Sequence, residues 1–280
     1  MAKNTDKYKI YRGYYSKDSG QTWVEYDKYA YVLEEKHSTD CGYENTIIID
    51  TDGVEHELDI EGTISKSSYS GEVAVNDVAE VKIGKKVTAI GVGAFMNCDN
   101  MTKVTIPNSV THIQNDAFNN CDKLTGITVP DSVFNIGYYA FMCCKNLETA
   151  VIGSGMTYVP RQAFYNSPKL SSVTLPDTIT SIGPNAFQGC AKLKTIHIPN
   201  SVVYFGDKSF ISCTSLVSIW FPPNTKYIGD YAFSNCRSLS DIRYGNTTSK
   251  FFAIIKGDNY FDTTIPTSYV QCTDGYYTFM

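Results

Sequence analysis

Residues 182–202 read IGPNAFQGCAKLKTIHIPNSV, and this arrangement of residue types returns along most of the chain. Its anchor is a phenylalanine that recurs at intervals of 23 residues without insertion or deletion. The seven positions are Phe95, Phe118, Phe141, Phe164, Phe187, Phe210 and Phe233. A strict period of this length is the sequence signature of a solenoid, in which stacked repeats bury one continuous core that no single repeat forms alone.

Further columns keep the same period. A cysteine stands three residues after the phenylalanine in six of the seven repeats, and leucine or methionine stands six after it. In the segment Leu124–Val129, the apolar Ile127 and Val129 alternate with outward residues and predict a short strand. Proline follows this segment in five repeats and ends the strand, because it lacks the N–H for another rung. The five-residue spacing of Ile136 and Phe141 predicts one tight helical turn between them.

This repeat resembles the BspA-type (Treponema pallidum-like) leucine-rich repeats over roughly residues 73–255. The resemblance implies a repeat solenoid: a right-handed leucine-rich-repeat superhelix of parallel short strands and short helical turns with a 23-residue period. It also implies binding, since members of that family are mostly surface or secreted adhesion and interaction proteins without a common catalytic site. Repeat four departs from the pattern with Pro160 and Ser167, which a solenoid tolerates.

The segments on either side of the repeats are predicted to cover the exposed ends of the solenoid. Val81 and Ile83 already fit the strand columns, so the solenoid is predicted to begin near them. At the other end Phe251 falls on an apolar column, after which the period is lost. We therefore predict a solenoid over residues 73–255 and a C-terminal cap over residues 256–280.

Residues 1–72 are a different kind of sequence. They carry 8 basic and 15 acidic residues, against 16 and 14 in residues 73–280, so the overall charge of −5 averages two unlike parts. Alternation at residues 8–11 and 29–32 predicts strands, and Asp50–Gly53 predicts a hairpin turn rather than a calcium loop. The segment is therefore predicted to be a small antiparallel β module that attaches or caps the solenoid.

Residues Ser16–Trp23 match the Asp-box pattern Ser-x-Asp-x-Gly-x-Thr-Trp, which is familiar from sialidases. In those enzymes the motif is a structural turn, in which the aspartate caps and the glycine takes a positive φ. Residues 1–72 contain one such box and one arginine, Arg12, which are too few for a sialidase, so a glycan-active enzyme is a remote alternative. The wider segment Tyr8–Tyr43 is similar to a short module of uncharacterised proteins from gut Bacteroidetes and their phages.

The repeat accounts for most of the nine cysteines. Six share one column with a spacing of about 4.8 Å, and parallel stacked side chains hold their Cβ atoms farther apart than a disulfide favours. Buried thiols that pack as small apolar groups are therefore favoured over disulfides, while Cys41, Cys143 and Cys272 lie off the column. No zinc-ligand spacing, catalytic histidine arrangement or phosphate-binding glycine loop occurs. We accordingly expect no enzymatic activity, no catalytic or metal-binding residue and no cofactor.

The outward strand column supplies the candidate partner-binding site. Its last three members are His197, Trp220 and Arg243, whereas its earlier members are mostly threonine. A tryptophan between a histidine and an arginine on a solvated face is typical of an interface hot spot. A second column, six residues before each phenylalanine, contributes Tyr204 and Tyr227 as further candidates. Aromatic rows of this kind suit a protein partner, a surface glycan or a second copy of the same chain.

Composition narrows the remaining classes of function. The balance of 24 basic and 29 acidic residues disfavours nucleic-acid binding, and no apolar run reaches the roughly 20 residues needed for membrane insertion. The first residues lack a signal-peptide pattern, and free thiols suit folding in a reducing cytoplasm. We predict a non-enzymatic binding protein on a phage virion surface, folded in the host cytoplasm, with residues 1–72 contacting other virion proteins. The alternative is a bacterial cell-surface or secreted adhesin of BspA type.

Overall fold

The computed structural model divides the chain into two units, Met1–Ser38 and Thr39–Met280. The structure describes residues 9–11, 14–16, 24–25 and 43–279. In the first unit three short strands form an antiparallel sheet in chain order, namely β1 (Lys9–Tyr11), β2 (Tyr14–Ser16) and β3 (Val24–Glu25). Strand β1 confirms the strand predicted at residues 8–11. The strand predicted at residues 29–32 and the Asp-box residues 17–23 lie outside the described residues.

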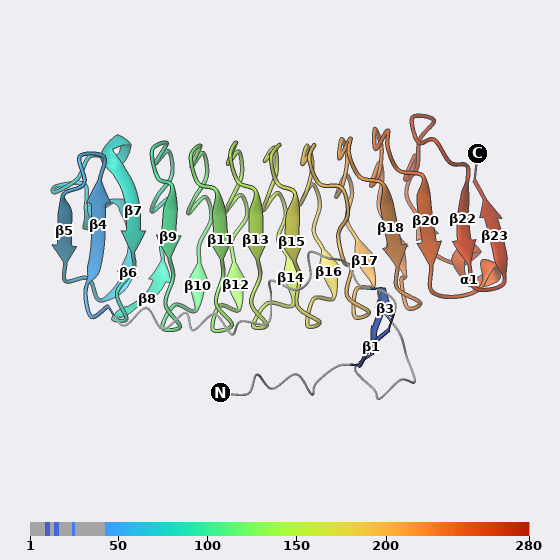
Figure 1. Cartoon of the computed structure of the whole chain (residues 1–280), viewed down its shortest axis with the longest axis horizontal. Coiled ribbons are helices and arrows are strands. Elements are labelled where there is room, and N and C mark those ends of the chain that lie inside the picture. Colours follow the sequence, from blue (N-terminus) through green and yellow to red (C-terminus); the bar gives the residue numbers. More distant parts are fainter. Residues whose placement is uncertain (1–8, 12–13, 17–23, 26–42, 280) are drawn as a thin grey trace. The chain divides into compact units, whose positions relative to one another are not determined.

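The second unit is a β-solenoid whose repeats place strands in two rows (Figure 1). Row A contains the strands predicted after the cysteine column: β9 (Lys103–Thr105), β11 (Gly126–Thr128), β13 (Thr149–Val151), β15 (Ser172–Thr174), β18 (Ser218–Phe221) and β20 (Asp241–Tyr244). Strands of the same sheet pair in parallel at 23-residue offsets, for example Ile127 with Ala150, whereas β9 and β11 belong to separate sheets. Buried and solvent-facing residues alternate along these strands, which confirms the predicted pattern. The row is interrupted at residues 193–199, which form no strand.

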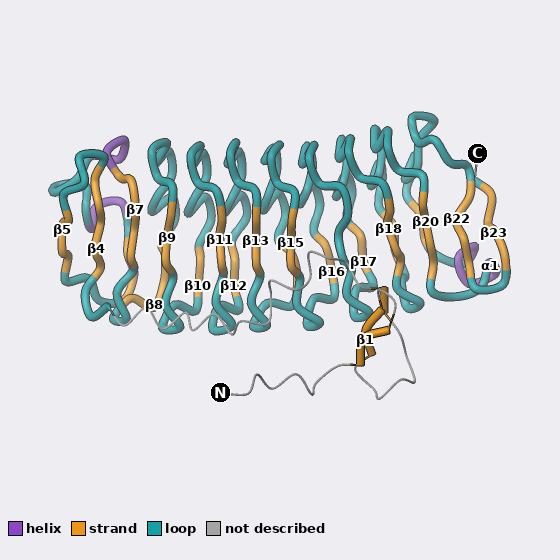
Figure 2. Tube along the Cα trace, in the orientation of Figure 1, coloured by secondary structure: helices purple, strands orange, loops and turns teal. Residues whose placement is uncertain are grey.

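Row B runs through the segment for which the sequence predicts a helical turn. Its strands are β8 (Val87–Ile90), β10 (His112–Ile113), β12 (Asn135–Ile136), β14 (Tyr158–Val159), β16 (Ser181–Ile182), β17 (Tyr204–Phe205), β19 (Tyr227–Ile228) and β21 (Ile255–Lys256). No helix forms between Ile136 and Phe141, where a two-residue strand leads into consecutive turns. Within the described part of the chain, helical residues occur only in the segments that close the two ends (Figure 2).

Backbone hydrogen bonds to the next repeat hold the turn that carries each phenylalanine. In the fourth repeat the N–H groups of Gln162, Phe164 and Asn166 donate to carbonyl oxygens of the fifth repeat at 3.0, 2.9 and 2.7 Å. Gln162 and Asn166 are left-handed, with φ of 55° and 54°. This alternation turns every second N–H toward the next repeat, so the turn forms a third hydrogen-bonded ladder beside the two rows of strands.

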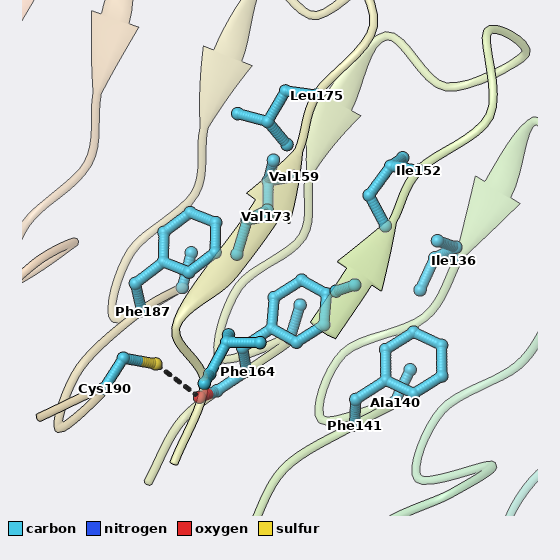
Figure 3. Close-up of a cluster of buried hydrophobic side chains, with 14 of the residues drawn as sticks. Ile136, Ala140, Phe141, Ile152, Val159, Phe164, Val173, Leu175, Phe187 and Cys190 are labelled. Carbon is cyan, nitrogen blue, oxygen red and sulfur yellow. Dashed lines mark hydrogen bonds between the residues drawn. The ribbon is translucent and has the colours of Figure 1, made fainter. Parts of the chain in front are cut away.

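The phenylalanine rings form one stack through the core, with ring centroids 5.2–5.5 Å apart from Phe95 to Phe233. Figure 3 shows the part of this stack at Phe141, Phe164 and Phe187. From the second repeat onward, the side chain in the cysteine column donates to the backbone carbonyl of the phenylalanine in the preceding repeat, as Cys190 Sγ does to Phe164 O at 3.3 Å. Ser167 makes the equivalent bond to Phe141 O. The eight cysteines in the described residues are free thiols, which confirms the prediction for the six in the column.

The N-terminal end of the solenoid begins with an additional, irregular repeat. Strand β6 (Gly62–Ile64) pairs in parallel with β8, and the Tyr69 ring stacks on Phe95 with centroids 5.5 Å apart. Ile64 and Tyr69 keep the five-residue spacing of the other repeats, but three extra residues follow before the next strand. A short 3-10 helix at Lys66–Ser68 lies between Ile64 and Tyr69, and a second at Val75–Asp77 lies in the loop after Tyr69.

An antiparallel hairpin closes row A at the same end. It consists of β4 (Thr46–Asp50) and β5 (Glu55–Leu58), and β4 pairs with β7 (Val78–Lys82) of the first repeat. The turn predicted at Asp50–Gly53 is confirmed, with the Gly53 N–H donating to Asp50 O at 3.0 Å. Residues 43–72 thus pack with the solenoid, and the boundary predicted at residue 72 falls inside the second unit.

At the C-terminal end the repeat pattern continues past residue 255, where the sequence analysis places its end. Five inserted residues, accommodated by helix α1 (Thr248–Phe252), shift the register, so that Lys256 pairs with Ile228. Phe261 then packs against Phe233 with ring centroids 5.5 Å apart and extends the aromatic column. Strand β22 (Tyr269–Cys272) continues row A, and β23 (Gly275–Thr278) pairs with it antiparallel.

A substitution at Cys143 tests the left-handed positions. Cys143 has φ of 58° where four other repeats have asparagine, the residue that best tolerates this conformation after glycine. The Asn166 amide reaches only the Cys143 sulfur at 3.8 Å, whereas Asn120 Nδ2 donates to Asn97 Oδ1 at 3.1 Å. Cys143→Asn should therefore raise the free energy of unfolding in urea by about 1 kcal/mol.

The adjacent cysteine is the matched control for this change. Cys144 is buried and donates to Phe118 O, so Cys144→Asn forces a larger polar group into the core and should lower stability by about 2 kcal/mol or more. Destabilisation by Cys143→Asn comparable to that of Cys144→Asn would contradict the strain argument.

The buried thiols predict a loss of stability at alkaline pH. Burial raises the pKa of Cys144, Cys190 and Cys236 from 9.0 to about 12. Between these pH values the unfolded chain has lost protons that the folded chain keeps, so stability falls as pH rises. At pH 10 each such thiol should lower the free energy of unfolding by about 1.4 kcal/mol, measured as a lower urea midpoint than at pH 7.5.

The variant Cys190→Ser separates this effect from general alkaline unfolding. Ser167 shows that a hydroxyl fits the column, and serine has no proton to lose in this range. The variant should lose about 1.4 kcal/mol less stability between the two pH values than the unsubstituted chain. An identical pH dependence in the two proteins would exclude the proposed contribution of the thiols.

Candidate functional site

The structure places the predicted site residues in two groups. His197, Trp220 and Arg243 occupy equivalent outward positions in three successive repeats on the side of row A. Tyr204 and Tyr227 occupy outward positions of row B. Because both rows direct alternate side chains into the same core, their outward side chains lie on different sides of the solenoid. The five residues therefore do not form a single site.

On the side of row A, Trp220 and Arg243 are direct neighbours in the paired strands β18 and β20. Trp220 is half-buried, and its ring lies over Gly245, where an added Cβ atom would stand 3.1 Å from Trp220 Cζ2. Pro223 Cδ would stand 3.0 Å from the same added atom, so the proline and the ring together leave little room for a side chain at Gly245. Trp220 therefore packs partly against the solenoid.

Charged and polar neighbours fix the rest of this face. The exposed Arg243 donates from Nε to Asp241 Oδ1 at 2.8 Å, a pair two residues apart on the outward side of β20. An exposed ion pair of this kind contributes little stability, but it orients the guanidinium group. His197 is exposed in the segment where row A has no strand. We call His197, Trp220 and Arg243 the tryptophan face.

On the side of row B, the two tyrosines form a preorganised pair. The rings of Tyr204 and Tyr227 stack with centroids 4.7 Å apart and planes 8° apart. The Tyr227 hydroxyl donates to Asp207 Oδ1 at 3.1 Å, and Asp207 also accepts the Asp230 N–H. Burial, followed by the nearby Asp207 carboxylate, raises the pKa of Tyr227 to about 12, so the hydroxyl stays protonated as a donor. We call Tyr204, Tyr227 and Asp207 the tyrosine face.

Asp207 was not among the site residues predicted from the sequence. A signal exists in the column three residues before the phenylalanine, where Asn115, Asp207 and Asp230 each accept a backbone N–H from the next repeat. These side chains are parts of the inter-repeat ladder, and Asp207 is the member that also contacts an outward aromatic residue.

The chemistry of the described residues suits binding rather than a nucleophile or a metal. No group of three or more histidine, cysteine or acidic side chains in the described part of the chain could hold a metal ion. Burial raises the pKa of the cysteine-column thiols, which therefore remain protonated at neutral pH. Asp50 pairs with His56 at 2.9 Å, but both belong to the N-terminal hairpin, where Asp50 also accepts two turn N–H groups.

Comparison with known proteins gives a family match. The model of the BspA type leucine rich repeat region matches residues 63–191 and 135–264. No curated protein matches the chain. No helix among the described residues is long and apolar enough to cross a membrane.

Solved structures of leucine-rich repeat proteins are similar to this chain. A leucine-rich repeat protein from Eubacterium ventriosum ATCC 27560 is 22% identical with a TM-score of 0.52, over 84% of this chain and 55% of that one. A leucine rich cell surface protein from Faecalibacterium prausnitzii A2-165 is 26% identical with a TM-score of 0.38, over 64% and 63%. The T. pallidum leucine-rich repeat protein is 24% identical with a TM-score of 0.41, over 64% and 72%. The chain thus spans less than two thirds of the first two proteins.

Proposed function

The chain belongs to the BspA-type leucine-rich repeat family, and on that premise we propose that it is a non-enzymatic binding protein of the adhesin kind. Its partner is a protein or a glycan on a cell surface. The observation that carries the proposal is the extent of the family match, which spans nearly the whole solenoid. Inward side chains of these repeats are committed to the core, so recognition falls to the outward columns.

The tryptophan face supports this proposal. Aromatic and arginine side chains dominate the energetics of protein interfaces, and both kinds meet here on adjacent strands. Trp220 is already packed against Gly245, and Arg243 is oriented by Asp241, so little side-chain freedom is lost when a partner binds. We therefore assign the principal contact to Trp220, with Arg243 and His197 at its flanks.

The raised thiol pKa values support the non-enzymatic part of the proposal. A protonated, buried cysteine is a poor nucleophile and a poor metal ligand. The described residues likewise bring no histidine and carboxylate together with a nucleophile.

The proposed location of the protein rests on its family. The family supports a location on the bacterial cell surface or in the secreted fraction, as for an adhesin. The phage virion surface, with residues 1–72 contacting other virion proteins, stays a prediction without support from the repeats. A contact between two copies of the chain through the tyrosine face also stays a prediction.

Retention of beads on cells tests the proposed function. Beads that carry the full chain should adhere to cultured epithelial cells, and Trp220→Ala should lower the retained fraction about fivefold or more. The reason is the loss of the aromatic surface at the centre of the tryptophan face. Counting the retained beads under flow gives the measurement, and periodate oxidation of the cells distinguishes a glycan from a protein partner.

The matched control is Thr128→Ala, a change in the same outward column three repeats before His197 and away from the tryptophan face. It should leave retention unchanged, and both variants should keep the urea unfolding midpoint near that of the original chain. No retention of the original chain, or equal retention of Trp220→Ala and Thr128→Ala, would reject the proposed role of this face.

A further inference from the structure

A shallow groove lies on the side of row B, away from both faces described above. Its volume is about 280 Å³, slightly below the usual range for sites that hold drug-sized ligands. The groove lies over strands β10 and β12 and the turns that follow them. Its lining consists of Val92, His112, Ile113, Gln114, Asn115, Asn135 and Gly137.

Two amide side chains in this groove are oriented by the backbone. Gln114 Oε1 accepts the Val92 N–H at 3.1 Å, and Asn115 Oδ1 accepts the Tyr138 N–H at 2.9 Å. Each amide oxygen is thus engaged, so the NH₂ groups remain as donors to a ligand. The exposed Asn135 side chain makes no hydrogen bond to another described residue and offers both an acceptor and two donors.

Apolar surface lies beside these polar groups. The Phe134 side chain is 54% exposed, and its ring meets the His112 ring edge to face with centroids 4.7 Å apart. His112 Nδ1 lies 2.8 Å from Thr111 Oγ1, which leaves Nε2 as the ring nitrogen available to a ligand. Val92, which is 65% exposed, adds an aliphatic wall.

The charge of the lining restricts the ligand. None of its seven residues is a lysine, arginine, aspartate or glutamate. An anionic ligand would therefore lose hydration without gaining a fixed positive partner, and a cationic one would lack a carboxylate. Neutral hydroxyl groups, by contrast, are matched by amide donors and acceptors, and the C–H face of a sugar ring packs well on an aromatic ring.

We propose that this groove is a binding site for a neutral hexopyranose unit of a glycan. Asn135, Gln114 and Asn115 hydrogen-bond the sugar hydroxyls, and Phe134 packs against the C–H face of the ring. The small volume of the groove suits a single sugar ring rather than a folded protein segment. The site is separate from the tryptophan face and does not depend on the function proposed for it.

Binding of neutral trisaccharides to the full chain tests this site. Trisaccharides of glucose, galactose and mannose are titrated and followed by saturation-transfer NMR and calorimetry, with a sialylated trisaccharide as the charged comparison. At least one neutral sugar should bind, and Asn135→Ala and Phe134→Ala should each weaken it about fivefold or more. Both residues are exposed, so neither change removes a core contact.

Thr157→Ala is the matched control, because Thr157 is the exposed equivalent of Phe134 one repeat later but has no aromatic ring to pack on the lining residue His112 as Phe134 does. It and Trp220→Ala should leave the affinity within about twofold, which separates this site from the tryptophan face. The proposal is overturned if no neutral trisaccharide binds, if the sialylated sugar binds as tightly, or if Asn135→Ala and Phe134→Ala bind like Thr157→Ala.

Discussion

The hydrogen-bonded turn beneath the aromatic column is the constraint on which the rest of the solenoid depends. Three N–H groups of each such turn donate to the next repeat, and the phenylalanine between them stacks on its neighbour at 5.2–5.5 Å. An insertion inside this turn would break both the ladder and the stack. The two irregular repeats keep the five-residue spacing, at Ile64 and Tyr69 and at Lys256 and Phe261, although the Tyr69 N–H donates within its own turn, to Lys66 O. Their extra residues lie in loops outside it.

The same constraint explains why a charged residue can occupy a core column at the C-terminal end. Lys256 takes the position that isoleucine holds in most other repeats. Its Nζ donates to the carbonyl oxygens of Phe251 and Ile254 and lies 4.7 Å from the Phe251 ring centroid. Burial lowers the pKa of Lys256 to about 8. The two carbonyl oxygens lie at the end of helix α1 and just after it. Together with the aromatic ring, they compensate part of the hydration that the ammonium group loses. The lysine thus closes the core where no further repeat follows in the described chain.

The 23-residue period of the sequence was enough to predict the parts of the fold that repeat without insertion. The cysteine column, the strands of row A and the buried thiols follow from residue types at fixed spacing. Row B could not be recognised, because a two-residue strand such as Tyr158–Val159 is too short to show an alternation of period two. The end repeats were missed for a different reason: insertions of three and five residues moved Tyr69 and Phe261 out of the column. Phe251 is buried, but it falls on the apolar column five residues before each phenylalanine only when the five-residue insertion is ignored. The candidate residues predicted from the sequence do not form one site, because Trp220 and Tyr204 belong to different rows.

In a solenoid, side chains of adjacent repeats lie together although they are far apart in the sequence. Phe134 and His112 are 22 residues apart, yet their ring centroids are 4.7 Å apart, because equivalent positions of adjacent repeats are one strand spacing apart. The side chains of Gln114 and Asn115 are likewise fixed by N–H groups of neighbouring repeats. Hydrogen bonds between the repeats therefore also orient the side-chain amides of Gln114 and Asn115 in the groove. Such a surface can change its ligand by exchanging exposed residues such as Asn135, while the aromatic core and the backbone ladder stay the same.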